Sequence, residues 1–241
     1  MMNNNILKRY DVILIKDPRE ILLLRGVGCK WRKCTFCDYH LDSNPNKKEN
    51  FILNKMAIDQ VTGQFGKLEI VNSGSVVDLD DDTINYIISK CEKKHIYTVI
   101  FESHWIHRYE LKRIKEYFKK FGITVKFKAG VETFNIPFRE QYLNKGFKNA
   151  SPQDIAAYFD QVNLLQGLPN QTSQSMENDI NIGLENFERV CVNIMQKNTT
   201  SISPSINVVN EFIKNVMPKF IRNKRVDILL KNTDFGIGEK L

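Results

Sequence analysis

Residues 28–37 read GCKWRKCTFC, a stretch that places Cys29, Cys34 and Cys37 within nine residues. Three closely spaced thiolates can hold three irons of a cubane iron–sulfur cluster, leaving the fourth iron open to a small molecule. The same thiolates could instead combine with His40 to close a tetrahedral zinc site of structural type. The spacing alone is compatible with both an iron–sulfur cluster and a zinc site, so the rest of the chain has to distinguish between them.

The composition is that of a globular protein large enough to bury a core, with 241 residues of which 42% are hydrophobic. The formal charge is 35 − 28 = +7, but the basic residues are spread along the chain, which is weak support for a nucleic-acid partner. No run of eighteen apolar residues occurs, and residues 1–5 are polar, so neither a membrane span nor a secretion signal is expected. Five cysteines, an odd number, favour metal binding over disulfides. We therefore expect a single cytoplasmic domain covering residues 1–241.

Short, mostly apolar segments alternate along the chain with amphipathic helices. A hairpin is expected first, followed by further strands, at residues 12–15, 21–24, 68–72, 97–102, 125–131, 161–166, 190–195 and 226–230. Apolar stripes with helical spacing occur at residues 84–91, 111–121 and 208–216. Apolar strands separated by helices indicate βα units around a parallel sheet. A complete eightfold barrel uses about 250 residues. The chain has about six βα units, which predict an α/β fold: a partial, open parallel β/α barrel with an N-terminal hairpin.

The two remaining cysteines belong to the predicted core. Cys91 lies on the apolar stripe of a predicted helix, and Cys191 lies inside a predicted buried strand. Free cysteine behaves as a small hydrophobic residue in such places. We therefore exclude both from the metal site.

Polar residues follow six of the expected strands, where the chemistry of α/β barrels collects. Besides the cysteine loop, these residues are Asn72, Ser73, Gly74 and Ser75, then Glu102 and His104, then Glu132, then Gln166 and Gly167, and finally Asn193. Each group alone could be a helix cap. Their recurrence at one rim beside three thiols indicates a cofactor pocket, which a zinc site of structural type would not explain.

The cysteine loop, including the aromatic Phe36 before its last cysteine, resembles the cluster loop of the radical S-adenosylmethionine (SAM) superfamily. The commonest spacing there is three residues and then two, whereas this chain has four and then two. Residues 71–75 stand where the superfamily has a Gly-Gly-Glu-like segment that holds the SAM amino group, although the Glu is absent here. Length, the N-terminal hairpin and residues 232–236 most resemble the queuine lyase family, which acts in queuosine salvage. Further similarity to that branch lies at Glu102, residues 130–133, 144–146 and 167–172.

The resemblance implies a [4Fe-4S] cluster on Cys29, Cys34 and Cys37, with SAM chelated at the open iron. The implied cofactor-binding residues are Phe36, Asn72, Ser73, Gly74, Ser75, Glu102, Glu132, Gln166, Gly167 and Asn193. An electron from a donor such as flavodoxin or ferredoxin would cleave SAM to methionine and a 5′-deoxyadenosyl radical. The radical would remove hydrogen from the ribose of queuosine or its 5′-phosphate, and breakage of the N-glycosidic bond would free queuine.

Substrate contacts follow from the chemistry of a deazapurine nucleotide. Its N–H edge favours a carboxylate, and the candidates are Asp38, Asp227, Asp234 and Glu132, any of which could instead be a salt-bridged surface group. The side chains that could border or stack on the base are Tyr39, His40, His104 and Trp105. A phosphate would need cations, and those near the expected rim are Arg25, Lys128 and Lys145, although Arg25 could equally pair with a carboxylate.

Two other functions remain open at this point. A radical SAM enzyme that modifies tRNA or another nucleoside could use the +7 charge against phosphates. The chain leaves no room for an appended RNA-binding module, so direct tRNA binding is not expected. A non-enzymatic zinc-binding protein is the more distant alternative.

Overall fold

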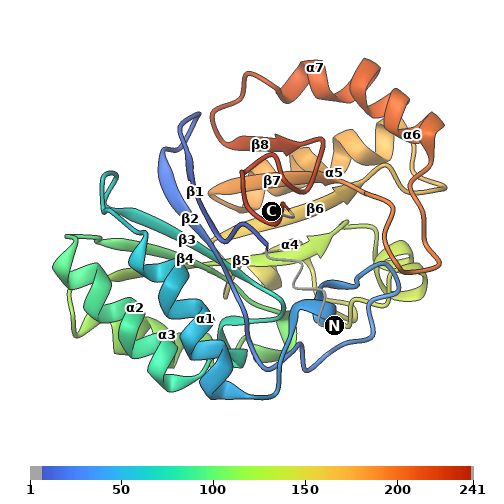
Figure 1. Ribbon diagram of the computed structural model, residues 1–241. Helices are drawn as coiled ribbons and strands as arrows, with labels where there is room; N and C mark the ends of the chain where they lie inside the picture. The colour runs from blue at the N-terminus through green and yellow to red at the C-terminus, as the bar shows by residue number, and fades with distance from the viewer. Residues whose placement is uncertain (1–6, 240–241) are drawn as a thin grey trace.

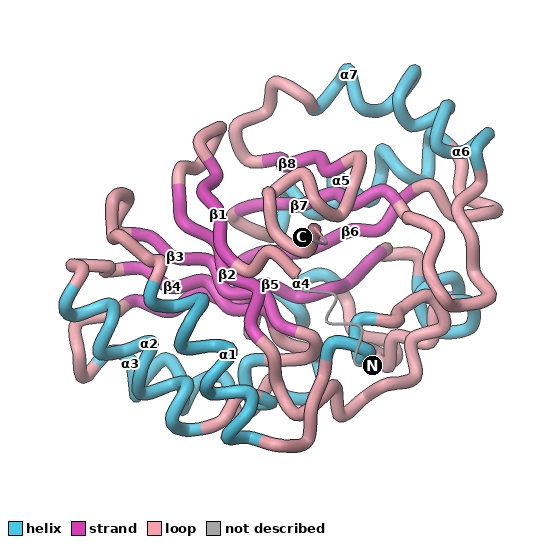
Figure 2. Tube along the Cα trace, viewed as in Figure 1, coloured by secondary structure: helices cyan, strands magenta, loops and turns pink. Residues whose placement is uncertain are grey.

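The computed structural model describes residues 7–239, and its centre is one eight-stranded sheet (Figures 1 and 2). The strands are β1 (Tyr10–Ile13), β2 (Arg19–Leu24), β3 (Lys67–Asn72), β4 (Thr98–Glu102), β5 (Thr124–Glu132), β6 (Gln161–Gln166), β7 (Arg189–Ile194) and β8 (Val226–Leu229). They neighbour one another in chain order. β1 and β2 form the antiparallel N-terminal hairpin, and every later pair is parallel. The polar residues 1–5 lie outside the described part.

A helical crossover follows each strand from β2 to β7, which confirms six βα units and a partial, open barrel. The helices are α1 (Lys47–Asp59), α2 (Asp81–Lys93), α3 (Leu111–Lys119), α4 (Pro152–Ala156), α5 (Ser173–Asn186), α6 (Ile206–Glu211) and α7 (Met217–Phe220). Figure 1 shows α1, α2 and α3 together over one part of the sheet and α5, α6 and α7 over the other. Within residues 7–239, no helix is long and apolar enough to cross a membrane.

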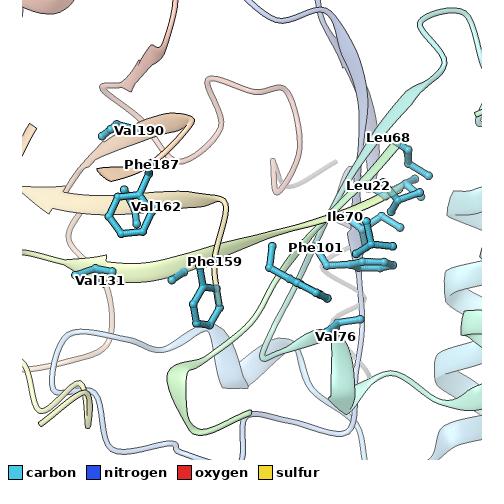
Figure 3. Packing of buried hydrophobic residues seen from close by; sticks show 14 of the residues in the cluster. Leu22, Leu68, Ile70, Val76, Phe101, Val131, Phe159, Val162, Phe187 and Val190 are labelled. Carbon is cyan, nitrogen blue, oxygen red and sulfur yellow. The ribbon is translucent and has the colours of Figure 1, made fainter. Parts of the chain in front are cut away.

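The main core lies between the outer face of the sheet and these helices. Figure 3 shows Leu22, Ile70 and Phe101 from three neighbouring strands packed together there. The predicted stripe of α2 is part of this core, with Cys91 fully buried. Cys191 is 5% exposed within β7, so both cysteines are buried as predicted, but Cys191 faces the inside of the barrel together with Asp227 rather than the main core.

Alternate residues of each strand face the inside of the barrel rather than the helices. On β2, Leu22 belongs to the core under the helices, whereas Ile21 packs with Ile237 of the C-terminal segment. The backbone of Gly238 donates a hydrogen bond to the carbonyl of Lys8, ahead of β1. The C-terminal segment therefore covers the inner face of the sheet beside the hairpin.

A buried ion network fills the barrel near the amino-terminal ends of the strands. Arg19 and Lys128 both pair with the carboxylate of Glu69, and Asp227 lies 2.8 Å from Arg189 and 3.5 Å from Arg19. Lys128 is aligned with the first residue of β6, and Asp227 is the second residue of β8. The expectation that Lys128 and Asp227 reach the rim is therefore wrong, because both point inward below it and neutralise charges there.

Candidate active site

The inside of the barrel is accessible to solvent at the carboxyl ends of the strands. Inward-facing residues there are partly exposed, in contrast to the buried ion network below them: Leu23, Val71, Glu102, Gly130, Asn163 and Asn193. This burial pattern places polar side chains from β4, β6 and β7 at the same solvent-accessible end of the barrel. The cysteine loop, which follows β2, borders the same end of the barrel.

The cysteine loop packs on the sheet through Phe36, which is 9% exposed and contacts a small apolar cluster together with Cys34 and Cys37. The backbone N–H of Arg32 points at Cys29 Sγ, 3.5 Å away. Cys29 also lies against the loop after β3, where a Cβ added to Gly74 would come within 3.2 Å of its backbone. The loop that bears the three thiols is thus in contact with the predicted SAM-binding segment.

Hydrogen bonds from two later loops hold the cysteine loop in place. Asn198 Nδ2 donates to the carbonyl of Phe36 at 2.7 Å, and the Thr199 backbone N–H donates to Asp38 Oδ2 at 3.0 Å. The Thr35 hydroxyl donates to the loop after β5. The carboxylate of Asp38, a predicted substrate contact, is therefore engaged in fastening this loop to the loop after β7.

The three thiols suit a metal chemically, since sulfur donors favour iron–sulfur clusters and zinc. Burial raises the pKa of Cys34, and it raises the pKa of Cys37 to about 12. Without metal these thiols are therefore neutral, and metal binding must release their protons. Across residues 7–239, no three His, Cys, Asp or Glu side chains, the three loop cysteines included, are drawn together as a metal group.

Several buried polar atoms around this end of the barrel make no hydrogen bond within the described chain. They are Asn72 Oδ1, Ser73 Oγ, Ser103 Oγ, Asn163 Oδ1 and Gln166 Oε1. An unsatisfied buried polar group costs about 1–3 kcal/mol, so such a concentration calls for a ligand. Most of these residues lie at or just after the ends of β3, β4 and β6. They fit a polar cofactor such as SAM.

Other predicted cofactor residues shape this polar region. Asn72 Nδ2 donates to the carbonyl of Ser75 at 3.0 Å, and the Ser75 hydroxyl accepts from the His104 backbone N–H at 2.9 Å. Gly167 has φ +85°, a left-handed conformation that favours glycine. The loops after β3 and β4 are thereby linked to each other, and Gly167 sets the turn that follows β6.

Glu102 and Asn163 form a polar pair inside the barrel, with Asn163 Nδ2 donating to Glu102 Oε1 at 2.6 Å. Burial raises the pKa of Glu102, and the charge of Lys128 only partly opposes this effect. Glu102 was predicted, whereas Asn163 was missed. The signal was present, because Asn163 is polar at an inward position of an otherwise mostly apolar strand.

A second pair, Glu132 and Lys145, lies beside the cysteine loop. Glu132 is 9% exposed, Lys145 is 6% exposed, and their Oε1 and Nζ atoms are 3.0 Å apart. The Lys145 ammonium also lies 5.5 Å from the centre of the Phe36 ring. Lys145, predicted as a phosphate ligand, is thus a buried neighbour of the thiols.

Tyr39 and His40 lie together in a short 3-10 turn that follows the cysteine loop. The Tyr39 side chain is 58% exposed, yet the pKa of its hydroxyl is raised, first by burial and then by the nearby Cys37, Glu102 and Glu132. His40 is half-buried in the same turn.

Two predicted substrate residues are engaged elsewhere. Arg25 donates from Nε to Asn50 Oδ1 at 2.8 Å, so its guanidinium holds α1 rather than standing free for a phosphate. Asp234 Oδ2 accepts from the backbone N–H groups of Leu230 and Lys231, at 2.7 and 2.9 Å. Both side chains therefore organise local structure in this arrangement.

His104 connects two loops instead of offering a free ring nitrogen. Its Nε2 lies 2.8 Å from the carbonyl of Lys145, and its Nδ1 accepts from the Ile106 backbone N–H. Burial lowers the pKa of His104 to about 3, so the ring is neutral and Nε2 donates. Trp31, a cysteine-loop residue that the sequence did not single out, stacks on this ring at 5.5 Å. Trp105 is 8% exposed and belongs to the core.

Replacing Gly146 by Ala is expected to loosen the cysteine loop. Gly146 has φ +71°, and an added Cβ would lie 2.4 Å from the Trp31 ring. Gly122 is the matched control, since it has φ +74° and nothing within 4 Å of an added Cβ. Both substitutions carry the left-handed backbone penalty of about 1–2 kcal/mol, and only Gly146→Ala adds overpacking of about 1–3 kcal/mol. Urea unfolding and retained iron per chain measure the two effects, and equal losses in both proteins would contradict the packing argument.

No family model matches the chain. A solved structure, queuine lyase from Clostridium spiroforme bound to SAM and queuine, is 36% identical to it and superposes with a TM-score of 0.92. That match covers 97% of this chain and 100% of the other. An uncharacterized protein of Methanocaldococcus jannaschii is 32% identical over 146 residues, which are 53% of this chain. The match spans only 39% of that archaeal protein.

Proposed function

Since this chain belongs to the queuine lyase family, we propose that it is a radical SAM lyase that releases queuine from queuosine or queuosine 5′-phosphate. The observation that carries the proposal is the likeness over nearly the whole chain to the Clostridium spiroforme lyase, whose structure holds SAM and queuine. The solvent-accessible carboxyl end of the barrel, with its unpaired polar atoms, supports a ligand site at the same place as the cysteine loop. Membership in an enzyme family leaves no support for a non-enzymatic zinc-binding protein.

In this proposal Cys29, Cys34 and Cys37 hold a [4Fe-4S] cluster. When bound, the cluster and SAM supply the electron and the 5′-deoxyadenosyl radical that takes a hydrogen atom from the ribose, after which the N-glycosidic bond breaks. The protein fixes the reactants and excludes water. Phe36 and its apolar neighbours shield the thiols on one side.

The unpaired oxygens at the ends of β3, β4 and β6 would receive the polar groups of SAM. Ser73 Oγ and Gln166 Oε1 are buried acceptors without partners, and Asn72 Oδ1 is a third. An ammonium group or ribose hydroxyls could donate to these atoms, replacing the hydrogen bonds that the fold leaves unmade. The missing Glu of the segment after β3 would thereby be compensated.

The substrate base would lie above Glu102 and below Tyr39. A deazaguanine edge presents N–H donors, which a carboxylate accepts, and Asn163 holds the Glu102 carboxylate in one orientation. The Tyr39 ring is exposed over the same space and could cover the base. Glu102 therefore replaces Asp227 and Asp234 as the substrate carboxylate that this geometry favours.

A protein electron donor such as flavodoxin or ferredoxin is part of the proposal. The cysteine loop presents three exposed cations, Lys30, Arg32 and Lys33, and no acidic residue between residues 28 and 37. An acidic redox partner would be steered to this loop by charge complementarity. The loop is also the part of the chain nearest the proposed cluster.

The experiment is anaerobic incubation of the iron-loaded protein with SAM, dithionite and queuosine 5′-phosphate or queuosine. We expect 5′-deoxyadenosine and free queuine to accumulate together, and neither product to form without reductant. A brown protein with broad absorption near roughly 400 nm and about four irons per chain should be isolated beforehand.

The possible negative results distinguish the radical SAM reaction from the lyase activity. Cleavage of SAM without queuine would retain the radical SAM reaction and reject the lyase, and unmodified or queuosine-containing tRNA would then be tested as substrate. Queuine released without 5′-deoxyadenosine would reject the radical route. A colourless, zinc-containing protein would reject both.

A further inference from the structure

The Lys145 ammonium is buried beside two of the three cluster cysteines, and the mechanism above gives it no task. Lys145 is only 6% exposed, and a lysine is rarely buried so completely unless it is paired. Its partner is Glu132, and the Phe36 ring of the cysteine loop covers it at 5.5 Å. The charge is thus fixed next to the loop and shielded from solvent.

The backbone around Lys145 is shaped to deliver this side chain. Its neighbours Asn144 and Gly146 both have left-handed conformations, with φ of +51° and +71°. Trp31 Nε1 donates to the Asn144 carbonyl at 2.8 Å, and His104 Nε2 donates to the Lys145 carbonyl at 2.8 Å. Two aromatic side chains, one of them from the cysteine loop, therefore clamp the segment that carries the ammonium.

The carboxylate partner, Glu132, has a strained backbone conformation. Glu132 has φ +68°, unusual for a residue other than glycine, at the irregularity where β5 shifts its register against β6. A Cβ on Gly130 would lie 2.7 Å from Glu132 Oε1 and 3.4 Å from Lys145 Nζ. Strain of this kind persists where the surrounding structure enforces it, and it gathers at functional sites.

The charges of Lys145 and Glu132 lie close to two of the three cluster cysteines. The ammonium faces the Phe36 ring, and Phe36 packs in one small apolar cluster with Cys34 and Cys37. The carboxylate of Glu132 lies 3.0 Å from this ammonium. A cation and a carboxylate are thus held beside the same two sulfur ligands.

We propose that Lys145 and Glu132 set the reduction potential of the cluster that Cys29, Cys34 and Cys37 would hold. This inference rests on the proposed function. Reduction adds one negative charge to the cluster, which a fixed ammonium favours and a fixed carboxylate opposes, and net charge near a cluster is a main determinant of its potential. The ammonium raises the reduction potential of the cluster, so that a protein donor can reduce it. Glu132 limits this rise, because a cluster with a higher potential is a weaker reductant and would cleave SAM less readily.

The test measures the midpoint potential of the iron-loaded protein without SAM or substrate. Lys145→Met should lower the equilibrium constant for reduction about tenfold, which is about 59 mV more negative for a one-electron couple. Lys145→Arg should stay close to the native potential, and Glu132→Gln should shift it in the positive direction. The midpoint potentials of Lys145→Met and Glu132→Gln must shift in opposite directions, because a merely loosened loop would shift both potentials in the same direction.

The matched control is the Lys128–Glu69 pair, which is equally buried but belongs to the ion network with Arg19 and does not pack on the cysteine loop. Lys128→Met should reduce stability and leave the potential unchanged, and an equal shift there would overturn the proposal. An unchanged potential in Lys145→Met with weakened SAM binding would also overturn it, making Lys145 a ligand of SAM. If the Lys145→Met protein does not retain iron, the sign of the potential shift in Glu132→Gln tests the proposal instead. A native protein that holds no cluster would instead reject the proposed function.

Discussion

The Cys34→Ala protein is expected to keep its fold but to lose the cluster and, with it, all cleavage of SAM. Removing one of three thiolates leaves a second iron without a protein ligand, so we expect the cluster to be lost when the protein is isolated. Cys34 is half-buried at the edge of a small apolar cluster, so Ala is tolerated there. Iron and sulfide per chain should fall to background, as should 5′-deoxyadenosine formed with SAM and dithionite. Cys29→Ala and Cys37→Ala should behave alike.

Cys91→Ala is the control for the loss of a cysteine as such. Cys91 is fully buried on α2, among core residues under the sheet. Its replacement leaves a small cavity that costs on the order of 1 kcal/mol, without effect on iron content or SAM cleavage. Full activity in Cys34→Ala would defeat the assignment of the cluster cysteines. Loss of iron in Cys91→Ala would show that core packing rather than ligation was being measured.

The sheet was predictable because its strands are short apolar runs between recognisable helices. Residues 161–166 were predicted with the bounds that β6 has, and the strands from β2 to β8 lie within two residues of their predicted positions. The first strand was placed two residues too late, at residues 12–15. Leu14 and Ile15 are apolar but 69% and 75% exposed, since pairing with β2 ends at Ile13.

The sequence pattern did not predict the helix α1. Its buried face includes Asn50 and Asn54, whose amides bind Arg25 at the end of β2, so the apolar stripe is interrupted. A helix that buries hydrogen-bonded amides is recognised only when the partner strand is in place.

The site was predictable in position but less so in its individual contacts. Strand ends identified the rim, where Asn72, Ser73 and Gln166 have buried oxygens without partners and Glu102 is partly exposed. The sequence did not indicate how far along a strand a side chain lies or whether it already has a partner. Lys128 was therefore taken for a rim cation, although it neutralises Glu69 deep in the barrel. Such pairings join residues about sixty positions apart, which periodicity does not reveal.

Glu69→Gln is expected to destabilise the protein by about 3–5 kcal/mol, because removing one partner leaves buried charges uncompensated. Glu69 is 1% exposed and accepts from both Arg19 and Lys128 at the base of the barrel. Urea unfolding measures the loss. The exposed pair of Lys55 and Asp59 is the control, since Asp59→Asn removes an ion pair of similar kind that solvent screens.

The pH dependence of the stability loss in Glu69→Gln distinguishes the effect of the Glu69 charge from that of its packing. Burial alone would raise the pKa of Glu69, but Lys128 and Arg19 reverse this and hold it at about 2, against an ordinary value of 4.5. A carboxylate with a lowered pKa stabilises the fold above its unfolded-state value, and the stabilisation is lost as the pH falls toward the folded-state value. The difference in unfolding free energy between native protein and Glu69→Gln should therefore be constant above pH 4.5 and shrink between pH 4.5 and 2. A difference that does not change with pH over that range would mean that the loss comes from the hydrogen bond that the Gln NH2 group cannot accept, and not from the charge of Glu69.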